Sequence, residues 1–304
     1  MDITPDDTKT LQKIQLLALL EVKRICDKHH IEYFLMYGSL LGAVRHNGFI
    51  PWDSDVDVGM LRCNYNRFIE ACKIDLSPLF FLQTHESDPA YVKSMIRLCV
   101  NDTKYVFRGM EHVEMHQGIF VDIFPIDQAP KQKLLQLYQY ILILWWKPAT
   151  LLKCNYISIP SQGLFKMLCY MVYLLPFVTI NDEKMYQKMD SILQKYNVVS
   201  SPYLLSGYGI QLVSYVNGMK FTKSETYSRN CYEKHYFTDL INMEFEGHFV
   251  SCPRRYHEIL SKIYGDYMTP PPIDKQKPLD SIVCLEFNKY SDPEYLQNLI
   301  DRYK

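Results

Sequence analysis

The stretch that decides the fold is residues 38–60, GSLLGAVRHNGFIPWDSDVDVGM. It follows a short aromatic and apolar run, residues 33–37, that is typical of a strand, and residues 40–45 are expected to form a helical turn before an Asn-Gly break. Over residues 53–60 acidic side chains alternate with small or apolar ones, and this period of two predicts a second strand. The stretch therefore predicts strand, glycine turn, short helix and strand in succession.

Three acids stand at alternate positions of this second strand. On a strand, the side chains of Asp53, Asp55 and Asp57 would share one face, with successive Cα atoms about 7 Å apart. Such crowding calls for a cation, and hard oxygen ligands suit Mg²⁺ or Mn²⁺. Because Mg²⁺ usually completes its shell with water and substrate phosphates, a phosphate substrate is implied. Taken alone, the strand would equally fit a solvated acidic sheet edge.

Two further features support a phosphate site. Gly38-Ser39 closes one strand and opens a helix, an arrangement in which backbone N–H groups and a hydroxyl hold a phosphate oxygen. Asp122 stands inside the apolar strand predicted over residues 119–124, where a metal or a shared proton would offset the cost of burying a carboxylate. A hydrogen-bonded structural acid is the alternative for Asp122. The ordered combination is more specific than any of its parts.

The rest of the chain divides into segments with different hydrophobic patterns. The first 127 residues alternate helical and strand patterns, with a helix from the Thr4 cap to about Lys28, a helix over 64–73, and strands over 80–83, 95–100, 105–107 and 119–124. Later segments are apolar runs at 134–146 and 164–175, a helix capped by Asn181, short strands near 208–213 and 242–250, and a helix over 253–264. We therefore expect a catalytic core over 1–130, a mostly helical apolar lobe over 131–200, and a part completing the domain over 201–304.

Composition limits the partners and the compartment. Thirty-three basic against 34 acidic side chains give a net charge of -1, which excludes a general nucleic-acid footprint. Nine cysteines without a C-x-x-C pair favour reduced thiols, and the acidic, polar first residues are unlike a secretory signal, so we expect a cytoplasmic protein. The longest uncharged stretch, 167–181, has 15 residues, fewer than the roughly 20 of a membrane-spanning helix.

Four motifs together resemble one family. They are residues 38–60, KSMIRLCVNDTKY at 93–105, GIFVDIFPID at 118–127, and YGDYMTPPP at 264–272. The glycine-serine turn, the D-x-D strand and the later single Asp resemble the nucleotidyltransferase superfamily. The motifs together resemble its LicD family of phosphocholine transferases, with fukutin-related protein as a distant relative. The resemblance implies an α/β (α+β) fold, a nucleotidyltransferase-like mixed sheet flanked by helices with an inserted helical lobe.

The resemblance also assigns roles to eight residues. It implies a phosphate-holding turn at Gly38 and Ser39, a metal-binding pair at Asp55 and Asp57, a third carboxylate at Asp122 that is either a ligand or a base, an orienting acid at Asp53, and substrate-binding cations at Lys93 and Arg97. Lys93 and Arg97 would share one face if their segment is a strand, and either would neutralise phosphate charge; surface solvation is the alternative for both.

The implied reaction is a Mg²⁺-dependent transfer of phosphocholine from a CDP-linked donor, CDP-choline, to a hydroxyl of a cell-surface glycan or its lipid-linked precursor, with release of CMP. Such glycans include teichoic acid and lipopolysaccharide. Transfer of ribitol phosphate, glycerol phosphate, phosphoethanolamine or a nucleotide by the same site is the alternative, because the machinery is indifferent to what the phosphorus carries. A non-catalytic glycan-binding protein is the third reading, which the three intact carboxylates disfavour.

The apolar runs at 134–146 and 164–177 suggest where such an enzyme would work. They contain Trp and Tyr, and Lys131, Lys133 and Lys147 flank the first run. Aromatic and basic residues of this kind favour a membrane interface, so we expect peripheral contact with the inner face of the cytoplasmic membrane. Helices buried as core, or in a dimer interface, are the alternative.

Overall fold

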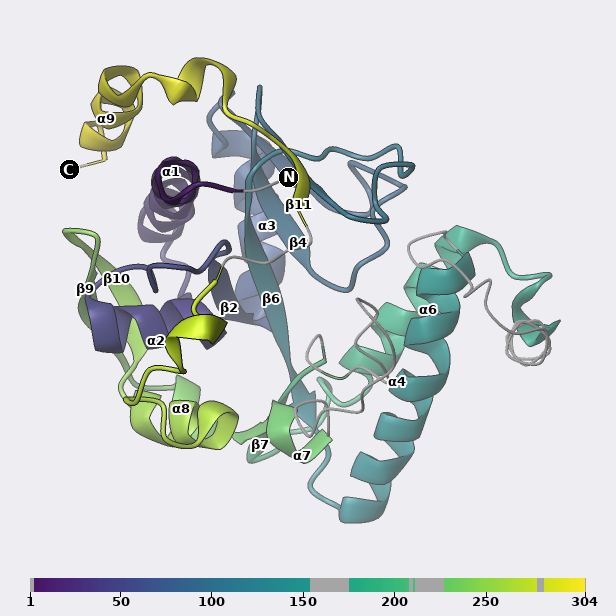
Figure 1. The fold of residues 1–304 in the computed structure, drawn as a ribbon. Coiled ribbons are helices and arrows are strands. Elements are labelled where there is room, and N and C mark those ends of the chain that lie inside the picture. Colours follow the sequence, from purple (N-terminus) through teal and green to yellow (C-terminus); the bar gives the residue numbers. More distant parts are fainter. Residues whose placement is uncertain (1–2, 154–174, 208–209, 211–226, 278–281, 304) are drawn as a thin grey trace.

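The computed structural model describes residues 3–153, 175–207, 210, 227–277 and 282–303 (Figure 1). Its first helix, α1 (Pro5–His29), begins where the sequence predicted. The Thr4 hydroxyl accepts from the Asp7 N–H at 3.1 Å, and the Asp7 carboxylate accepts from the Thr4 N–H at 3.0 Å. This capping box satisfies N–H groups that have no partner within the helix, and so defines where α1 starts.

A seven-stranded mixed sheet forms the centre of the molecule and confirms the predicted α/β class. Its central order is β1-β2-β6-β4-β3, and β7 and β8 extend it from the far end of β6. The strands are β1 (Phe34–Leu35), β2 (Asp57–Leu61), β3 (Phe80–Gln83), β4 (Ile96–Val100), β6 (Phe120–Ala129), β7 (Tyr203–Ser206) and β8 (Cys231–Glu233). Only the β2–β6 pairing is parallel among these strands. Strand β6 runs past the predicted end at residue 124 because β7, about 80 residues later in the chain, pairs with its second half.

Two small antiparallel sheets join distant segments. One pairs β5 (Lys104–Phe107) with β11 (Ile282–Glu286), and the other pairs β9 (Leu240–Phe245) with β10 (His248–Pro253). The single strand predicted over 242–250 is wrong, because Glu246 and Gly247 form a tight turn with φ of 52° and 76°. Both values match a two-residue hairpin turn, which alternating hydrophobicity alone did not reveal.

The remaining helices pack around the sheet. Helices α2 (Tyr37–His46), α3 (Arg62–Asp75), α8 (Tyr256–Tyr264) and α9 (Pro293–Asp301) complete the main body with α1, whereas α7 (Tyr227–Asn230) packs against α4. Helix α1 contacts β4, β6, α3 and α9, while α2 contacts β2, α8 and β9. The apolar side of α1, which includes Leu17 and Val22, is fully buried in the core. Burial of this helix between the sheet and α9 therefore joins the two ends of the described chain.

Helices α4 (Lys133–Lys153) and α6 (Asp182–Gln194) lie side by side, apart from α1 and α9 (Figure 1). Asn181 caps α6 as predicted, and Met189 and Ile192 pack with Ile143 of α4 in a second, smaller core. The apolar run predicted over 164–175 lies outside the described residues except for its last position, as does most of the strand predicted over 208–213. Among the helices that the structure describes, none combines the length and apolarity needed to span a membrane.

Candidate active site

The glycine-serine turn lies in the first turn of α2, which starts at Tyr37 and so earlier than predicted. The Ser39 hydroxyl accepts from the N–H of Asp57 at 2.8 Å, and the N–H of Met36 donates to the carbonyl of Asp57 at 2.9 Å. The first bond uses a lone pair of the hydroxyl oxygen and not its proton. Ser39 therefore ties the start of α2 to the start of β2, and this bond leaves the hydroxyl free to donate its proton.

The acidic segment differs from its prediction, because β2 begins only at Asp57. Asp53 and Asp55 precede the strand and lie outside the sheet, so the prediction that all three acids lie on one strand is wrong. Side chains replace the missing strand partner. Gln12 Nε2 donates to the carbonyl of Asp53 at 2.9 Å, and Gln15 Nε2 and the Tyr105 hydroxyl both donate to the carbonyl of Ser54 at 2.9 Å. These bonds satisfy backbone groups that no ladder reaches.

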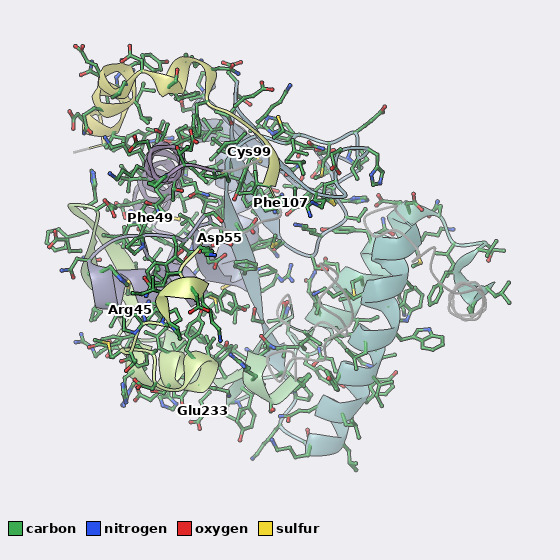
Figure 2. The ribbon with its side chains drawn as sticks, viewed as in Figure 1. Arg45, Phe49, Asp55, Cys99, Phe107 and Glu233 are labelled. Atoms are coloured by element: carbon green, nitrogen blue, oxygen red, sulfur yellow. The ribbon has the colours of Figure 1, made fainter. Side chains whose placement is uncertain are left out.

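The fold nevertheless brings the carboxylates of Asp57 and Asp122 together. The two residues are register partners in the parallel β2–β6 pair, and the N–H of Asp122 donates to the carbonyl of Val56 at 2.9 Å. Partners in register present their side chains on the same face of a sheet. Both residues are buried, and Asp55 lies half-buried just before them, near the middle of the molecule (Figure 2).

Arg97 lies on the other side of Asp122. It is the register partner of Asp122 across β4 and β6, and its Nε donates to Asp122 Oδ1 at 2.7 Å. Its guanidinium also stacks 3.5 Å from the centre of the Phe120 ring. Arg97 is 5% exposed, so this is a buried ion pair and not a solvated surface cation. A row of side chains, Asp57, Asp122 and Arg97, thus crosses three neighbouring strands.

Lys93 stands apart from this row. It lies in the loop before β4, which begins at Ile96, so the shared strand face considered for Lys93 and Arg97 does not exist. Burial, followed by the positive charge of Arg97, lowers the pKa of Lys93 to about 7, against the opposing effect of Asp122. Lys93 therefore lies within electrostatic reach of Asp122, although it stands in a loop and not on a strand.

The carboxylates themselves are electrostatically crowded. Burial raises the pKa of Asp57 well above its ordinary value, and the charges of Asp55 and Asp122 raise it further. The pKa of Asp55 is raised in the same way by burial and then by Asp53 and Asp122. Burial also raises the pKa of Asp53, whose carboxylate shares a hydrogen bond with Asp55. A buried group of like charges is held at a cost that a bound cation would relieve.

Asp53 faces the start of α2. A Cβ added at Gly38 would lie 2.5 Å from Asp53 Oδ2, so the absence of a side chain at position 38 is what lets this carboxylate approach the helix N-terminus. The N-terminus of a helix favours a negative charge. The structure therefore joins the predicted turn and the predicted orienting acid directly, a contact that the sequence interpretation did not contain.

Sequence reasoning also missed Tyr264, the last residue of α8 and the first of the motif at 264–272. Burial of its hydroxyl, and then the charges of Asp57 and Asp53, raise the pKa of Tyr264. Tyr264 therefore lies within electrostatic reach of these acids, while 42% of the residue is exposed. The motif itself was the available signal, but motif position alone does not show which residue of the nine faces the site.

Asp127, the last acid of the motif at 118–127, has a structural role. Asp127 accepts from Arg62 Nε at 2.8 Å and from Arg62 Nη2 at 2.7 Å, and also from Asn197 Nδ2 at 2.6 Å. Arg62 Nη1 lies 3.4 Å from Asp190 of α6. This bidentate network joins α3, β6 and α6, and so anchors the helical lobe to the sheet.

The donor set fits a magnesium-type ion only in part. Within the described ranges, no three His, Cys, Asp or Glu side chains converge closely enough to make a complete ligand set. Arg97 already engages one oxygen of Asp122. The two adjacent crowded acids, Asp55 and Asp57, match the one or two carboxylates by which Mg²⁺ is usually held when substrate phosphates supply other ligands.

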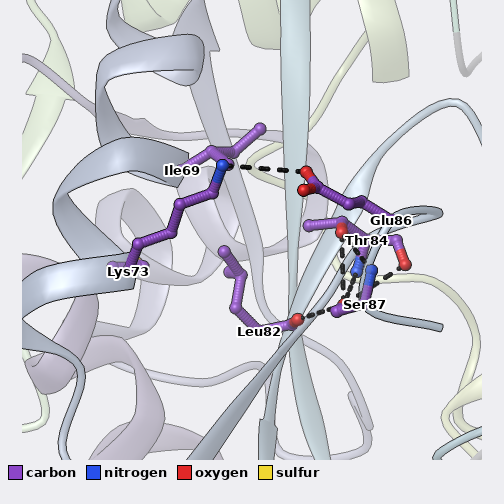
Figure 3. A pocket seen from close by; sticks show the side chains of 7 residues that line it. Ile69, Lys73, Leu82, Thr84, Glu86 and Ser87 are labelled. Atoms are coloured by element: carbon purple, nitrogen blue, oxygen red, sulfur yellow. Dashed lines mark hydrogen bonds and ion pairs between the residues drawn. The ribbon is translucent and has the colours of Figure 1, made fainter.

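Two surface hollows lined by described residues lie away from the carboxylate row. One of about 280 Å³ lies between α3 and the turn after β3, lined by Cys72, Leu82 and Ser87 among others, with Lys73 Nζ 3.7 Å from Glu86 across it (Figure 3). Another of about 400 Å³ follows β8 near His235. Neither is lined by a residue of the carboxylate row.

Comparison with known proteins gives the carboxylate row a family context. Residues 30–139 match the family model described as LicD/FKTN/FKRP, nucleotidyltransferase domain. The chain is 28% identical over 282 residues to the lipopolysaccharide cholinephosphotransferase LicD of Haemophilus influenzae, covering 88% of this chain and 95% of that protein. It is also 47% identical over 49 residues to the human ribitol 5-phosphate transferase FKRP, covering 15% of this chain and 10% of that protein. The resemblance to the LicD family is confirmed, and all eight residues to which it assigned roles lie within 30–139.

Proposed function

Because this chain carries a LicD-type nucleotidyltransferase domain, we propose that it is a phosphotransferase that moves phosphocholine from CDP-choline to a hydroxyl of a glycan, with release of CMP. The observation that carries the proposal is the buried row of Asp57, Asp122 and Arg97, with Asp55 beside it, inside the matched domain. Similarity to a cholinephosphotransferase over 88% of the chain supports phosphocholine as the group transferred.

Asp55 and Asp57 are the residues that would hold Mg²⁺ or Mn²⁺. Arg97 Nε already donates to Oδ1 of Asp122, so Asp122 would serve as a third ligand through Oδ2. When bound, such an ion would neutralise negative charge on the donor diphosphate. The first turn of α2, with Gly38 and Ser39, would supply N–H and hydroxyl donors to a phosphate oxygen.

The protein's own side chains then account for the transfer. A sugar oxygen forms a bond to the phosphorus that carries choline, the bond from that phosphorus to the CMP oxygen breaks, and CMP leaves. Asp122 is the residue proposed to accept the sugar proton, and Arg97 holds it in position from the neighbouring strand. Lys93 and Arg97 would stabilise negative charge that develops on the phosphate oxygens.

The donor head group is tested by a panel of CDP-choline, CDP-ethanolamine, CDP-ribitol and CDP-glycerol, scored for CMP release with Mg²⁺ and for product mass. We expect CDP-choline to be at least about tenfold better than the others, equivalent to roughly 1.4 kcal/mol in the transition state. Preference for CDP-ribitol would instead favour the ribitol phosphate alternative, which the short match to FKRP supports. Absence of CMP from every donor would contradict phosphotransfer.

We also propose that the protein contacts a membrane peripherally, because a lipid-linked acceptor would lie there. One side of α4 packs against α6, but the other carries Leu134, Leu137, Ile141 and Trp145, all 46% to 81% exposed and spaced along one stripe. The exposed basic residues Lys131 and Lys133 lie at the N-terminal end of α4. An apolar stripe beside basic residues suits the surface of an anionic bilayer.

Flotation with phosphatidylglycerol vesicles tests this contact. We expect the wild-type protein to float at low salt, less so at high salt, and not with phosphatidylcholine alone. Leu137→Glu should abolish flotation, whereas Ile74→Glu, which changes an 81% exposed residue on α3, should not. If the protein stays in the soluble fraction under every condition, the membrane contact is wrong and the stripe is instead an interface between protein surfaces.

A further inference from the structure

The turn between β9 and β10 contains an unusual residue. Glu246 is the first turn residue and has φ of 52°, in the left-handed region, and Gly247 follows at 76°. Turns of this type usually place Asn, Asp or Gly at such positions, because a longer side chain is strained there. A strained glutamate persists when surrounding contacts hold it, and such positions often serve a function.

Glu246 is held by three contacts with the loop that follows α2. Its N–H donates to the carbonyl of Asn47 at 3.0 Å, and its Oε1 accepts from the N–H of Phe49 at 3.0 Å. Between these two residues, a Cβ added at Gly48 would lie 2.1 Å from the same Oε1, so the glutamate side chain lies against the bare backbone of Gly48. The Phe49 ring also packs edge-on against the Phe245 ring, with centroids 4.9 Å apart.

This loop determines how the chain enters the acidic segment. Asn47 ends α2 with φ of 54°, and the N–H of Asp53 donates to the carbonyl of Ile50 at 2.9 Å. On its inner side the loop is pressed against α2, because a Cβ at Gly42 would lie 2.3 Å from the carbonyl oxygen of Gly48. Between α2 on one side and Glu246 on the other, the loop has little freedom to move.

We infer that Glu246 is a positioning residue that sets the place of the acidic segment through the loop of residues 47–50. It touches none of the carboxylates, and it acts by holding the backbone from which Asp53 and Asp55 follow, where no β ladder holds it. The part of this inference that concerns turnover rests on the proposed phosphotransfer, whereas the part that concerns the loop does not. The left-handed backbone and the loop contacts together explain why a glutamate occupies a position that suits glycine.

Two variants separate the carboxylate from the backbone. Glu246→Gly removes the side chain but suits the left-handed conformation, so the hairpin should keep its turn and the melting temperature should not fall. Glu246→Gln keeps an Oε1 acceptor for the Phe49 N–H and should restore wild-type behaviour. Glu244→Gln, at an exposed position on the same hairpin, is the matched control.

Hydrogen–deuterium exchange read on peptides covering residues 46–57 is the first measurement, and kcat and donor KM for CMP release are the second. For Glu246→Gly we expect at least tenfold faster exchange in these peptides, unchanged exchange in α1, and kcat lowered about tenfold with donor KM within twofold. The inference would be overturned if Glu246→Gly exchanged at the wild-type rate in residues 46–57, or if it exchanged faster throughout the protein. It would also be overturned if Glu246→Gln lost the same protection or the same kcat. If the wild-type protein releases no CMP from any donor, the proposed function fails, and the exchange data still decide the role of Glu246.

Discussion

At the scale of single residues, Asp122 has a central place because two neighbouring strands present opposite charges to it. Asp57 comes from the parallel partner and Arg97 from the antiparallel one. Arg97 offsets the charge of Asp122 directly, while Asp57 gains no such bond from Arg97 and has Asp55 as a further like-charged neighbour. One buried carboxylate is thus compensated by the protein, and the others are those that the proposed cation would compensate.

The Asp57→Asn variant should lose activity and gain stability without metal. Removing the charge relieves burial cost and repulsion from Asp55 and Asp122, so we expect about 1 kcal/mol more stability in EDTA at pH 7. CMP release should fall about 100-fold or more, since a proposed metal ligand is lost. Melting in EDTA and turnover with Mg²⁺ check both parts. A variant that keeps over a tenth of wild-type turnover would remove Asp57 from the ligand set.

The Arg97→Met variant should be strongly destabilised. It leaves the buried Asp122 carboxylate without its partner, which costs about 3 kcal/mol in comparable pairs. Adding Asp122→Asn should recover much of that loss, because the stranded charge is then removed. Urea unfolding of the single and double variants measures the coupling. Arg254→Met, which breaks an exposed pair with Asp239, is the control and should cost less than about 1 kcal/mol. Equal losses of unfolding free energy in Arg97→Met and Arg254→Met would contradict the assignment of Arg97 and Asp122 as a buried ion pair.

At the scale of elements, close backbone contact joins α2 to the loop that follows it. Gly42 lies against the carbonyl of Gly48, and Gly38 lies against the carboxylate of Asp53. Both glycines have ordinary negative φ values, so close packing and not backbone freedom accounts for them. Helix α2 can therefore present its first turn to the acidic segment only while these two positions carry no side chain.

Gly42→Ala should therefore destabilise the protein although alanine favours helices. The new Cβ would lie 2.3 Å from a backbone oxygen that no side-chain rotation can move. Overpacking of this kind costs about 1–3 kcal/mol, more than the roughly 1 kcal/mol that alanine gains over glycine in a helix. Urea unfolding gives the sign directly. A variant more stable than the wild-type protein would show that the loop moves away without cost.

At the scale of the whole molecule, Glu21 joins segments from both ends of the described chain. This fully buried carboxylate accepts from Arg24, from the N–H of Ser77 at 2.9 Å, and from the Tyr303 hydroxyl at 2.9 Å. Burial alone would raise the pKa of Glu21, but the bonds from Arg24, Ser77 and Tyr303 together hold it below its ordinary value near 4.5. Closure of α9 over α1 thus depends on an ionised glutamate.

Stability should depend on pH through this group. Because the folded-state pKa of Glu21 lies below its unfolded value, its contribution is present above about pH 4.5 and is lost as the pH falls through the folded-state pKa. Glu21→Gln should cost about 1–2 kcal/mol at pH 7, and progressively less as the pH falls below about 4.5. Urea unfolding across this range tests it, with the exposed Glu32→Gln as control. A cost that does not change with pH would contradict ionisation as the cause.

Local patterns in the sequence determined much of the fold and predicted the chemical type of the site. The capping box at Thr4, the Asn181 cap, the period-two acids and the lone Asp122 in an apolar strand each depend on neighbours within a few residues, and the sequence displays such neighbours directly. They predicted α1, α6, most strands of the main sheet and an acidic site of phosphate chemistry, although the period of two wrongly placed Asp53 and Asp55 on β2.

Only the tertiary structure decided which residues meet. Arg97 reaches Asp122 across 25 positions of sequence, Tyr105 reaches Ser54 across 51, and Glu246 reaches Phe49 across 197. Strand β2 also begins late, because side chains from α1 and β5 bind the backbone before Asp57. Periodicity describes the faces of one element, whereas these contacts depend on how elements pack, since burial and hydrogen bonding are satisfied over the whole molecule and not segment by segment.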